Sequence, residues 1–256
     1  MTIGEERARS DARVRPVLVT AVVGLLGWLV LAALAVGLGA LVTHVVVGHS
    51  LGHGDLDVAR WFAARRTDTW NTLSHVGSYL AETVTVFVVL AIALGVLAAR
   101  RAWPQCGLLV VSMAVEGGVY LVATYFVSRN RPAVPRLEHL IVSDSYPSGH
   151  TAAAMALYGS LCIIAWSLTR ARVWRALFLA LAFVGPLIVG TSRVYRGMHN
   201  VTDVVCGIVL GAGCIVVGYV AVKAGLASAQ RRAVTARSAT EMDDGPPPQL
   251  VHGVAR

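Results

Sequence analysis

Six long runs of apolar residues, separated by polar and charged segments, dominate the pattern along the chain. They cover, in order, Val17–Val42, Thr83–Ala99, Cys106–Val127, Ala152–Leu168, Val173–Gly190 and Val201–Val222. A helix needs roughly 17–25 predominantly apolar residues to cross about 30 Å of hydrocarbon, and each run has this length. The ten-residue alternating strands of a membrane barrel do not occur in the sequence. The pattern therefore predicts an all-α, polytopic membrane protein in which six transmembrane helices form a bundle.

The composition indicates that lipid surrounds most of the chain. Of its 256 residues, 56% are hydrophobic and 14% are charged, and the mean hydropathy is +0.66, whereas soluble domains carry about 25% charged residues. The first run is too long for the apolar region of a signal peptide, so we expect it to be retained as a helix. The four cysteines lie within the predicted spans without the spacing of a metal site. We therefore expect neither a metal nor another cofactor.

Basic residues gather in the segments that would share one side of the membrane. The four clusters are Arg7–Arg15, Arg100–Arg101, Arg170–Arg175 and Lys223–Arg237. The positive-inside rule makes this side cytoplasmic, which predicts a multi-pass protein of the plasma membrane with both termini in the cytoplasm. It also accounts for the net charge of +8 without a nucleic-acid partner. Arg131 and Arg193 fall on the opposite, outer face, where anion binding would explain a positive charge.

The same pattern divides the chain into three parts. Residues 1–15 are expected to form a basic cytoplasmic arm, residues 16–222 a six-helix membrane domain, and residues 223–256 a disordered cytoplasmic tail, because the tail loses its periodicity and becomes rich in proline. Between the first and second spans, Asp57–Trp70 alternates aromatic and basic residues and predicts an amphipathic helix lying in the membrane interface.

A histidine pair in the same outer segment has a spacing that could indicate a metal site, but the neighbouring residues favour a loop. His49 and His53 have the spacing of one helical turn, and Asp55 follows closely. Glycines among residues 48–54 disfavour the helix that this spacing requires. We therefore expect a solvated loop here.

Three short motifs with polar and charged side chains end or begin apolar runs far apart in the sequence. They are Arg131-Pro132, Tyr146-Pro147-Ser148-Gly149-His150, and Ser192-Arg193 followed by His199 and Asp203. With six spans, all three emerge on the outer face. Their agreement with the charge-based orientation indicates one shared site at a membrane surface.

The residue types in these motifs are suited to phosphate chemistry. Ser148 and Gly149 open a helix, whose first N–H groups bind phosphate, although a simple capped turn would look the same. His199 and Asp203 have i, i+4 spacing, so the carboxylate could accept the Nδ1 proton and leave Nε2 as a nucleophile. A helix-start carboxylate beside a histidine is the alternative. Arg131 and Arg193 would offer planar donors to phosphate oxygens.

Together the motifs resemble those of the type 2 phosphatidic acid phosphatase superfamily, over about residues 17–222. The resemblance implies a lipid phosphatase without a metal, in which His199 attacks phosphorus and becomes phosphohistidine while Asp203 orients it. It implies that His150 protonates the leaving oxygen and then helps to activate water. It further implies that Arg131, Ser148, Gly149 and Arg193 hold the phosphate.

One position departs from the family pattern. The family has a lysine seven residues before the arginine of its Arg-Pro pair, and this chain has Thr124 there. Only one of its 22 basic residues is lysine, so Arg129, two residues before Arg131, is the candidate replacement as a phosphate donor.

These observations predict a membrane enzyme that acts at the outer leaflet. The expected substrate is a lipid phosphate or diphosphate, such as a polyprenyl diphosphate, phosphatidic acid or phosphatidylglycerol phosphate, within surrounding membrane lipids. Two alternatives remain: transfer of the phosphate to a second lipid, and a family member weakened by the lost lysine that binds or transports lipid. A soluble haloperoxidase of the same superfamily is disfavoured by the apolar spans.

Overall fold

The structure, a computed structural model, describes residues 3–46, 50–139 and 144–243, and all of its regular elements there are helical. In chain order they are α1 (Ile3–Leu41), a π-helical turn η1 (Val42–Val46), α2 (Ser50–Ala63), α3 (Asp68–Tyr79), α4 (Thr83–Ala99), α5 (Trp103–Phe126), α6 (Gly149–Leu168), α7 (Arg172–Tyr195) and α8 (Val201–Asp243). The predicted all-α class is confirmed.

Five stretches of helix are long and apolar enough to cross a membrane: Val14–Val45, Trp103–Phe126, Gly149–Leu168, Arg172–Tyr195 and Val201–Thr235. The remaining predicted span coincides with α4, which has 17 residues. It follows α3 after a bend of 42°. Taken together, the two helices are long and apolar enough to form a sixth span. Each apolar run of the sequence therefore corresponds to one helix of the bundle.

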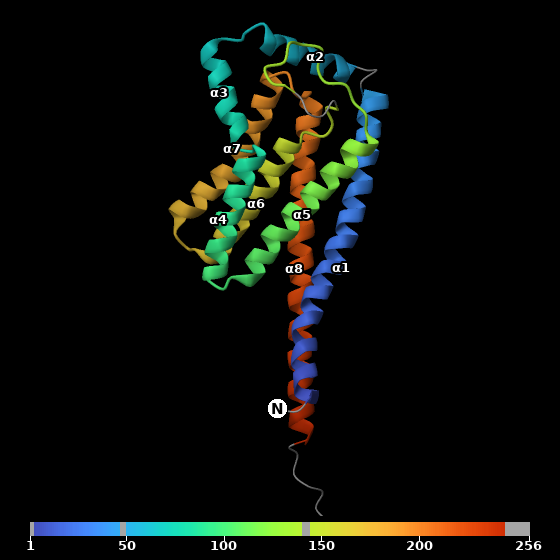
Figure 1. Ribbon diagram of the computed structural model, residues 1–256, viewed down its shortest axis with the longest axis vertical. Coiled ribbons are helices and arrows are strands. Elements are labelled where there is room, and N and C mark those ends of the chain that lie inside the picture. Colours follow the sequence, from blue (N-terminus) through green and yellow to red (C-terminus); the bar gives the residue numbers. More distant parts are fainter. Residues whose placement is uncertain (1–2, 47–49, 140–143, 244–256) are drawn as a thin grey trace, which may run out of the picture.

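The two terminal helices are longer than the sequence pattern predicted. α1 begins at Ile3, so most of the expected basic arm is helical, and α8 continues to Asp243 instead of ending near Val222. Alanine and arginine are frequent in these extensions, and both are strong helix formers. Figure 1 shows that α1 and α8 extend beyond the other helices, at the end of the bundle where the N-terminus lies. Residues 244–256 lie outside the described part of the chain.

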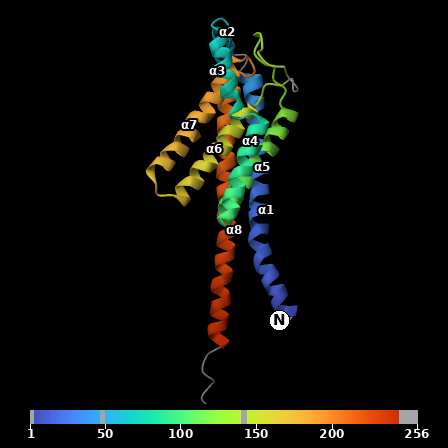
Figure 2. The same cartoon turned by 60° about the vertical axis from the view of Figure 1, so that its left-hand side comes forward.

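The segment between the first two spans also differs from its prediction. The amphipathic helix expected over Asp57–Trp70 is divided between α2 and α3, because Thr67 caps a new helix by accepting a hydrogen bond from the Trp70 N–H at 3.3 Å. α2 lies across the end of the bundle opposite the N-terminus (Figures 1 and 2). The loop expected around His53 and Asp55 belongs to α2, whereas His49 lies outside the described residues.

Small residues let the central helices approach closely enough to place the site. A Cβ atom on Gly207 of α8 would lie 2.7 Å from the backbone oxygen of Ser148 at the start of α6. Ala152 and Ala156 of α6 are fully buried in the same contact region. In membranes, where lipid is as apolar as leucine, such close backbone contacts are a main source of helix association.

Large apolar side chains cover the outside of the bundle. Examples on five different helices are Leu25, Phe87, Leu121, Phe183 and Val216, each about half exposed or more. A soluble protein rarely shows so continuous an apolar surface. The surface is the one expected of a bundle surrounded by lipid.

Candidate active site

The three sequence motifs meet at the end of the bundle across which α2 lies. Arg131 follows α5, Ser148 precedes α6, and His199 lies in the short turn between α7 and α8. Figure 1 shows these three connections together, far from the N-terminus. The links α4–α5 and α6–α7, which carry exposed arginines, lie at the other end of the bundle. The predicted convergence of the motifs on one face is therefore present in the structure.

His199 is buried, and one of its ring nitrogens has a defined partner. Nδ1 lies 2.7 Å from the backbone carbonyl oxygen of Ser145. Because a carbonyl oxygen only accepts hydrogen bonds, Nδ1 must be the donor, and Nε2 then carries the lone pair. Burial, followed by the positive charges of Arg193 and Arg131, holds the pKa of His199 well below its ordinary value of 6.5. The ring is therefore neutral at pH 7 and suited to act as a nucleophile.

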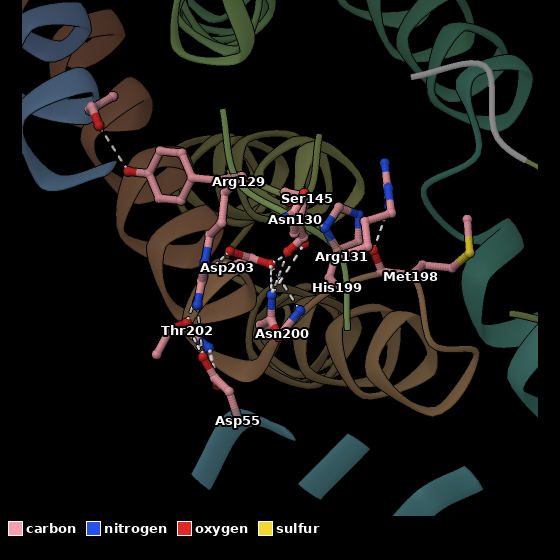
Figure 3. A network of polar contacts seen from close by, with 12 residues as sticks. Asp55, Arg129, Asn130, Arg131, Ser145, Met198, His199, Asn200, Thr202 and Asp203 are labelled. Carbon is pink, nitrogen blue, oxygen red and sulfur yellow. Dashed lines mark hydrogen bonds and ion pairs between the residues drawn. The ribbon is translucent and has the colours of Figure 1, made fainter. Parts of the chain in front are cut away.

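Asp203 is not the direct partner that the i, i+4 spacing suggested. α8 begins at Val201, so His199 precedes the helix and does not stack one turn above the carboxylate. Asp203 instead accepts a hydrogen bond from the backbone N–H of Asn200 at 2.8 Å, which is the geometry of a capping box. It also accepts from the hydroxyl of Ser145. Ser145 thus connects the two residues, since its hydroxyl contacts Asp203 and its carbonyl contacts His199 (Figure 3).

Arg129 contacts carboxylates, and its position does not favour the donor role that we expected for it. Its Nη2 donates to Asp55 at 2.9 Å, and its Nη1 donates to Asp203 and, at 2.7 Å, to the hydroxyl of Thr202. Both terminal nitrogens are therefore engaged. Thr124, at the position of the family lysine, donates to the Tyr120 carbonyl in its own helix at 2.9 Å.

Arg131 and Arg193 supply positive charge close to His199. The guanidinium of Arg193 is buried, and its Nη1 donates to Ser78 at 2.9 Å and to Glu138 at 2.6 Å. Its buried Nε has no hydrogen-bond partner among the described residues. Arg131 donates to the backbone carbonyl of Met198, and burial together with the charge of Arg193 lowers its pKa. An anion between the two arginines would relieve this repulsion and satisfy the unpaired N–H.

The start of α6 offers further donors. Ser148 is the N-cap residue, but its side chain makes no capping hydrogen bond, and its hydroxyl lies 2.8 Å from that of Thr151. The first backbone N–H groups of α6 are therefore not capped by that side chain, as suits an anion site. Gly149 is required sterically, because a Cβ atom there would lie 2.7 Å from the ring of Tyr120. We call Arg131, Ser148, Gly149 and Arg193 the anion cluster.

His150, the expected proton donor, directly follows Gly149 of this cluster in the first turn of α6. Its Nε2 is 3.3 Å from a carboxylate oxygen of Glu82, the N-cap residue of α4. The sequence did not indicate this contact, because the two residues are 68 positions apart. The backbone N–H of Ser148, two residues before His150, donates at 3.2 Å to the backbone carbonyl of Asp203, four residues after His199. The two histidines therefore belong to one site.

Glu138 is a second residue that the sequence did not single out. Its carboxylate accepts hydrogen bonds from Arg193 and Arg196, both buried at the end of α7. Burial opposes its ionisation, but the adjacent guanidinium groups of Arg193 and Arg196 hold the pKa of Glu138 below its ordinary value. Glu138 is therefore a negative charge that already contacts an arginine of the anion cluster.

An apolar cavity of about 690 Å³ opens beside the histidine and glycine of α6. Its wall combines Gly149, His150, Tyr120 and Glu116 with apolar side chains of α4, α5 and α6. A volume of this size is typical of a small-molecule site, and its lining is compatible with a hydrocarbon chain. Among the residues that the structure describes, no three His, Cys, Asp or Glu side chains are grouped as metal ligands.

Comparison with known proteins places the chain in a family. Residues 105–225 match the sequence profile of the PAP2 superfamily. Phosphatidylglycerophosphatase B of Bacillus subtilis is 30% identical over 143 residues, which are 54% of this chain and 66% of that protein. This chain belongs to the PAP2 superfamily.

Solved structures of PAP2 proteins share the arrangement of helices. The PAP2-type phosphatidylglycerolphosphate phosphatase of Bacillus subtilis aligns with a TM-score of 0.60 at 25% identity, over 82% of this chain and 94% of that one. LpxE of Aquifex aeolicus aligns with a TM-score of 0.51 at 24% identity, over 66% of this chain and 94% of that one. The bundle described above is therefore the membrane PAP2 fold.

A mammalian phosphatase matches over a shorter length. Mouse sphingosine-1-phosphate phosphatase 2 is 35% identical over 89 residues, which are 34% of this chain and 25% of that protein. The chain thus spans slightly less than two thirds of the bacterial relative and about a quarter of the mouse one.

Proposed function

We propose that this protein is a membrane phosphatase that hydrolyses a lipid phosphomonoester at the outer leaflet. One observation carries the proposal: a neutral, buried His199 lies at an anion cluster with an unpaired arginine N–H, next to an apolar cavity. The phosphate would occupy the anion cluster and the lipid tail the cavity. The names of the relatives support the proposal, since phosphatidylglycerophosphate and sphingosine-1-phosphate are both lipid phosphomonoesters.

The reaction would proceed through two displacements at phosphorus. The Nε2 lone pair of His199 attacks phosphorus, the bond to the lipid oxygen breaks, and His150 transfers a proton to that oxygen so that the lipid leaves as an alcohol. His150, now neutral, accepts a proton from water, which attacks the phosphohistidine and releases inorganic phosphate with His199 in its starting form. Arg131 and Arg193 stabilise the charge that builds on the phosphoryl oxygens.

The position of the site relative to the basic clusters supports the outer leaflet. The site lies at the end of the bundle opposite the exposed arginines at residues 100–101 and 170–172. If these arginines are cytoplasmic, as the positive-inside rule requires, the catalytic end faces outward. The substrate would then be drawn laterally from the outer leaflet.

Phosphate release by the purified protein in detergent micelles would test the proposal. The panel would contain phosphatidylglycerol phosphate, phosphatidic acid, sphingosine-1-phosphate and a polyprenyl diphosphate. We expect release of phosphate from at least one monoester. When the substrate phosphate is radioactive, we expect the wild type, but not His199→Ala, to carry a label that is labile in acid and stable in base. Label that moves to a second lipid instead of water would indicate phosphotransfer. Lipid binding without any release or labelling would contradict the proposal.

A further inference from the structure

A cluster of buried charge lies beside the anion cluster and contacts it where the backbone N–H of Ser148 donates to the backbone carbonyl of Asp203 at 3.2 Å. It consists of Asp55 in α2, Arg129 after α5 and Asp203 in α8, and each of these residues is at most 5% exposed. Figure 3 shows the guanidinium of Arg129 between the two carboxylates. Asp55 and Arg129 are 74 residues apart in sequence, as are Arg129 and Asp203. Three separate segments are therefore joined at this point.

The contacts concentrate on the first turn of α8. Arg129 donates from Nη2 to Asp55 and from Nη1 to Asp203 and Thr202. The other carboxylate oxygen of Asp55 accepts a hydrogen bond from the backbone N–H of Thr202 at 3.0 Å. Asp203 accepts from the backbone N–H of Asn200. Both carboxylates thus bind backbone donors at the start of the same helix.

This arrangement fixes the place where α8 begins. The first N–H groups of a helix have no partners within the helix, and negative charge is favoured there by the helix dipole. Two buried carboxylates at one helix start would repel each other, and Arg129 compensates their charge. Removing Asp55 or Arg129 would leave charged groups unpaired without removing any residue of the anion cluster.

The start of α8 in turn places the nucleophile. His199 is bonded directly to Asn200, whose N–H is held by Asp203. The second connection runs through Ser145, which donates to Asp203 and accepts from the His199 ring at 2.7 Å. A shift of the first turn of α8 would therefore move or rotate the imidazole relative to bound phosphate.

We infer that Asp55 and Arg129 are positioning residues, which hold the imidazole of His199 in line with the phosphorus atom of the substrate. The inference rests on the proposed phosphatase function. According to this inference, α2, the helix that lies across the end of the bundle, contributes to the positioning of His199 through Asp55. Arg129 then acts in positioning and not in phosphate binding. Neither side chain belongs to the anion cluster, so we expect their loss to affect the rate of the chemical step more than the binding of phosphate.

The test compares Asp55→Asn with Asp57→Asn, which removes an exposed carboxylate from the same helix. For Asp55→Asn we expect kcat to fall by about tenfold to a hundredfold, the range for a small misplacement of a reacting group. KM for the best lipid monoester and the inhibition constant of inorganic phosphate should both change by less than about twofold, because the anion cluster is intact. Asp57→Asn should behave as the wild type.

A second variant keeps the test decisive if Asp55→Asn does not fold. Arg129→Lys retains one positive charge but cannot contact both carboxylates through a planar fork, and we expect the same loss in kcat with unchanged phosphate inhibition. Thermal unfolding in detergent identifies folded variants. Wild-type kcat in a folded variant, or phosphate binding that weakens as much as kcat, would overturn the inference. Absence of turnover in the wild type would overturn the proposed function itself, which is a different result.

Discussion

Arginines at the two ends of the bundle have opposite environments. At the end where the N-terminus lies, Arg100, Arg101 and Arg170 are exposed. At the other end, Arg129 and Arg193 are at most 5% exposed and contact carboxylates, Asp55 being buried and Glu138 partly exposed. The first group is solvated and reports the orientation of the chain in the membrane. The second group is desolvated, so each of its charges needs a partner and each partner affects the chemistry.

The comparison shows how one residue type serves two purposes. Exposed charges interact weakly and are screened by salt, so the exposed arginines can be exchanged without consequence for the reaction. Arg193 and the half-buried Arg131 lower the pKa of His199, and the Nε–H of Arg193, which is unpaired among the described residues, offers a donor to an anion. Four predictions sharpen this contrast, from the largest expected effect to the smallest.

Substitution of the nucleophile has the largest effect. His199→Ala removes the proposed nucleophile, and we expect kcat to fall more than about 10³-fold. The measurement is phosphate release from the best lipid monoester, with thermal unfolding in detergent as a control for folding. Activity within tenfold of the wild type would remove His199 from the mechanism.

Arg193→Lys is the next largest change, because it keeps the charge but removes the buried Nε–H and the planar fork. A lost transition-state donor costs about 10²- to 10³-fold, and we expect this decrease in kcat/KM. The matched control is Arg100→Lys at the exposed end. Equal effects of the two substitutions would show that burial does not distinguish these arginines.

The pH dependence tests the electrostatic coupling between Arg131 and His199. His199 must be neutral to attack, and its lowered pKa places the acid limb of kcat/KM below pH 6.5. Arg131→Gln removes a positive charge that lowers this pKa, so the pKa rises and the acid limb moves to higher pH. Profiles of kcat/KM between pH 4 and 8 measure the shift of the pKa. A shift of one pH unit corresponds to roughly 1.4 kcal/mol of interaction between Arg131 and the protonated ring. An unchanged acid limb would contradict the coupling.

The exposed arginines are expected to show the smallest effect. Arg100→Gln and Arg170→Gln should change kcat/KM by less than about twofold, as is usual for surface positions. Their position can be checked separately with single cysteines on whole cells: a membrane-impermeant maleimide should label Arg136→Cys in the outer loop and leave Arg101→Cys unlabelled. The reverse labelling pattern would invert the proposed orientation.

The apolar pattern was sufficient to predict the helices of the membrane domain. The second run, Thr83–Ala99, coincides with α4, because a helix in lipid must satisfy its own backbone and can do so only with a continuous apolar stretch. The pattern failed at the ends of the chain, where α8 continues to Asp243. There helix propensity, not hydropathy, extends the helix.

The convergence of the motif residues was predicted from the sequence, whereas the hydrogen bonds among them were not. His199, His150, Arg131 and Arg193 all lie at the predicted end of the bundle. We predicted Asp203 as the hydrogen-bond partner of His199 because residues four apart lie on the same face of a helix. However, α8 begins two residues after His199, and the ring contacts Ser145 instead. Ser145 could not be identified, because its backbone carbonyl is the group that contacts the ring.

The sequence by itself determined the class of the protein, the number of apolar runs and the residues able to carry the chemistry, because hydrophobic length and side-chain type are properties of the local chain. Only the tertiary structure decided how the buried charges are paired: Asp55 with Arg129, Arg129 with Asp203, and Glu138 with Arg193. These pairs join segments far apart in sequence, and their stability depends on exclusion of water, which arises only when the helices pack.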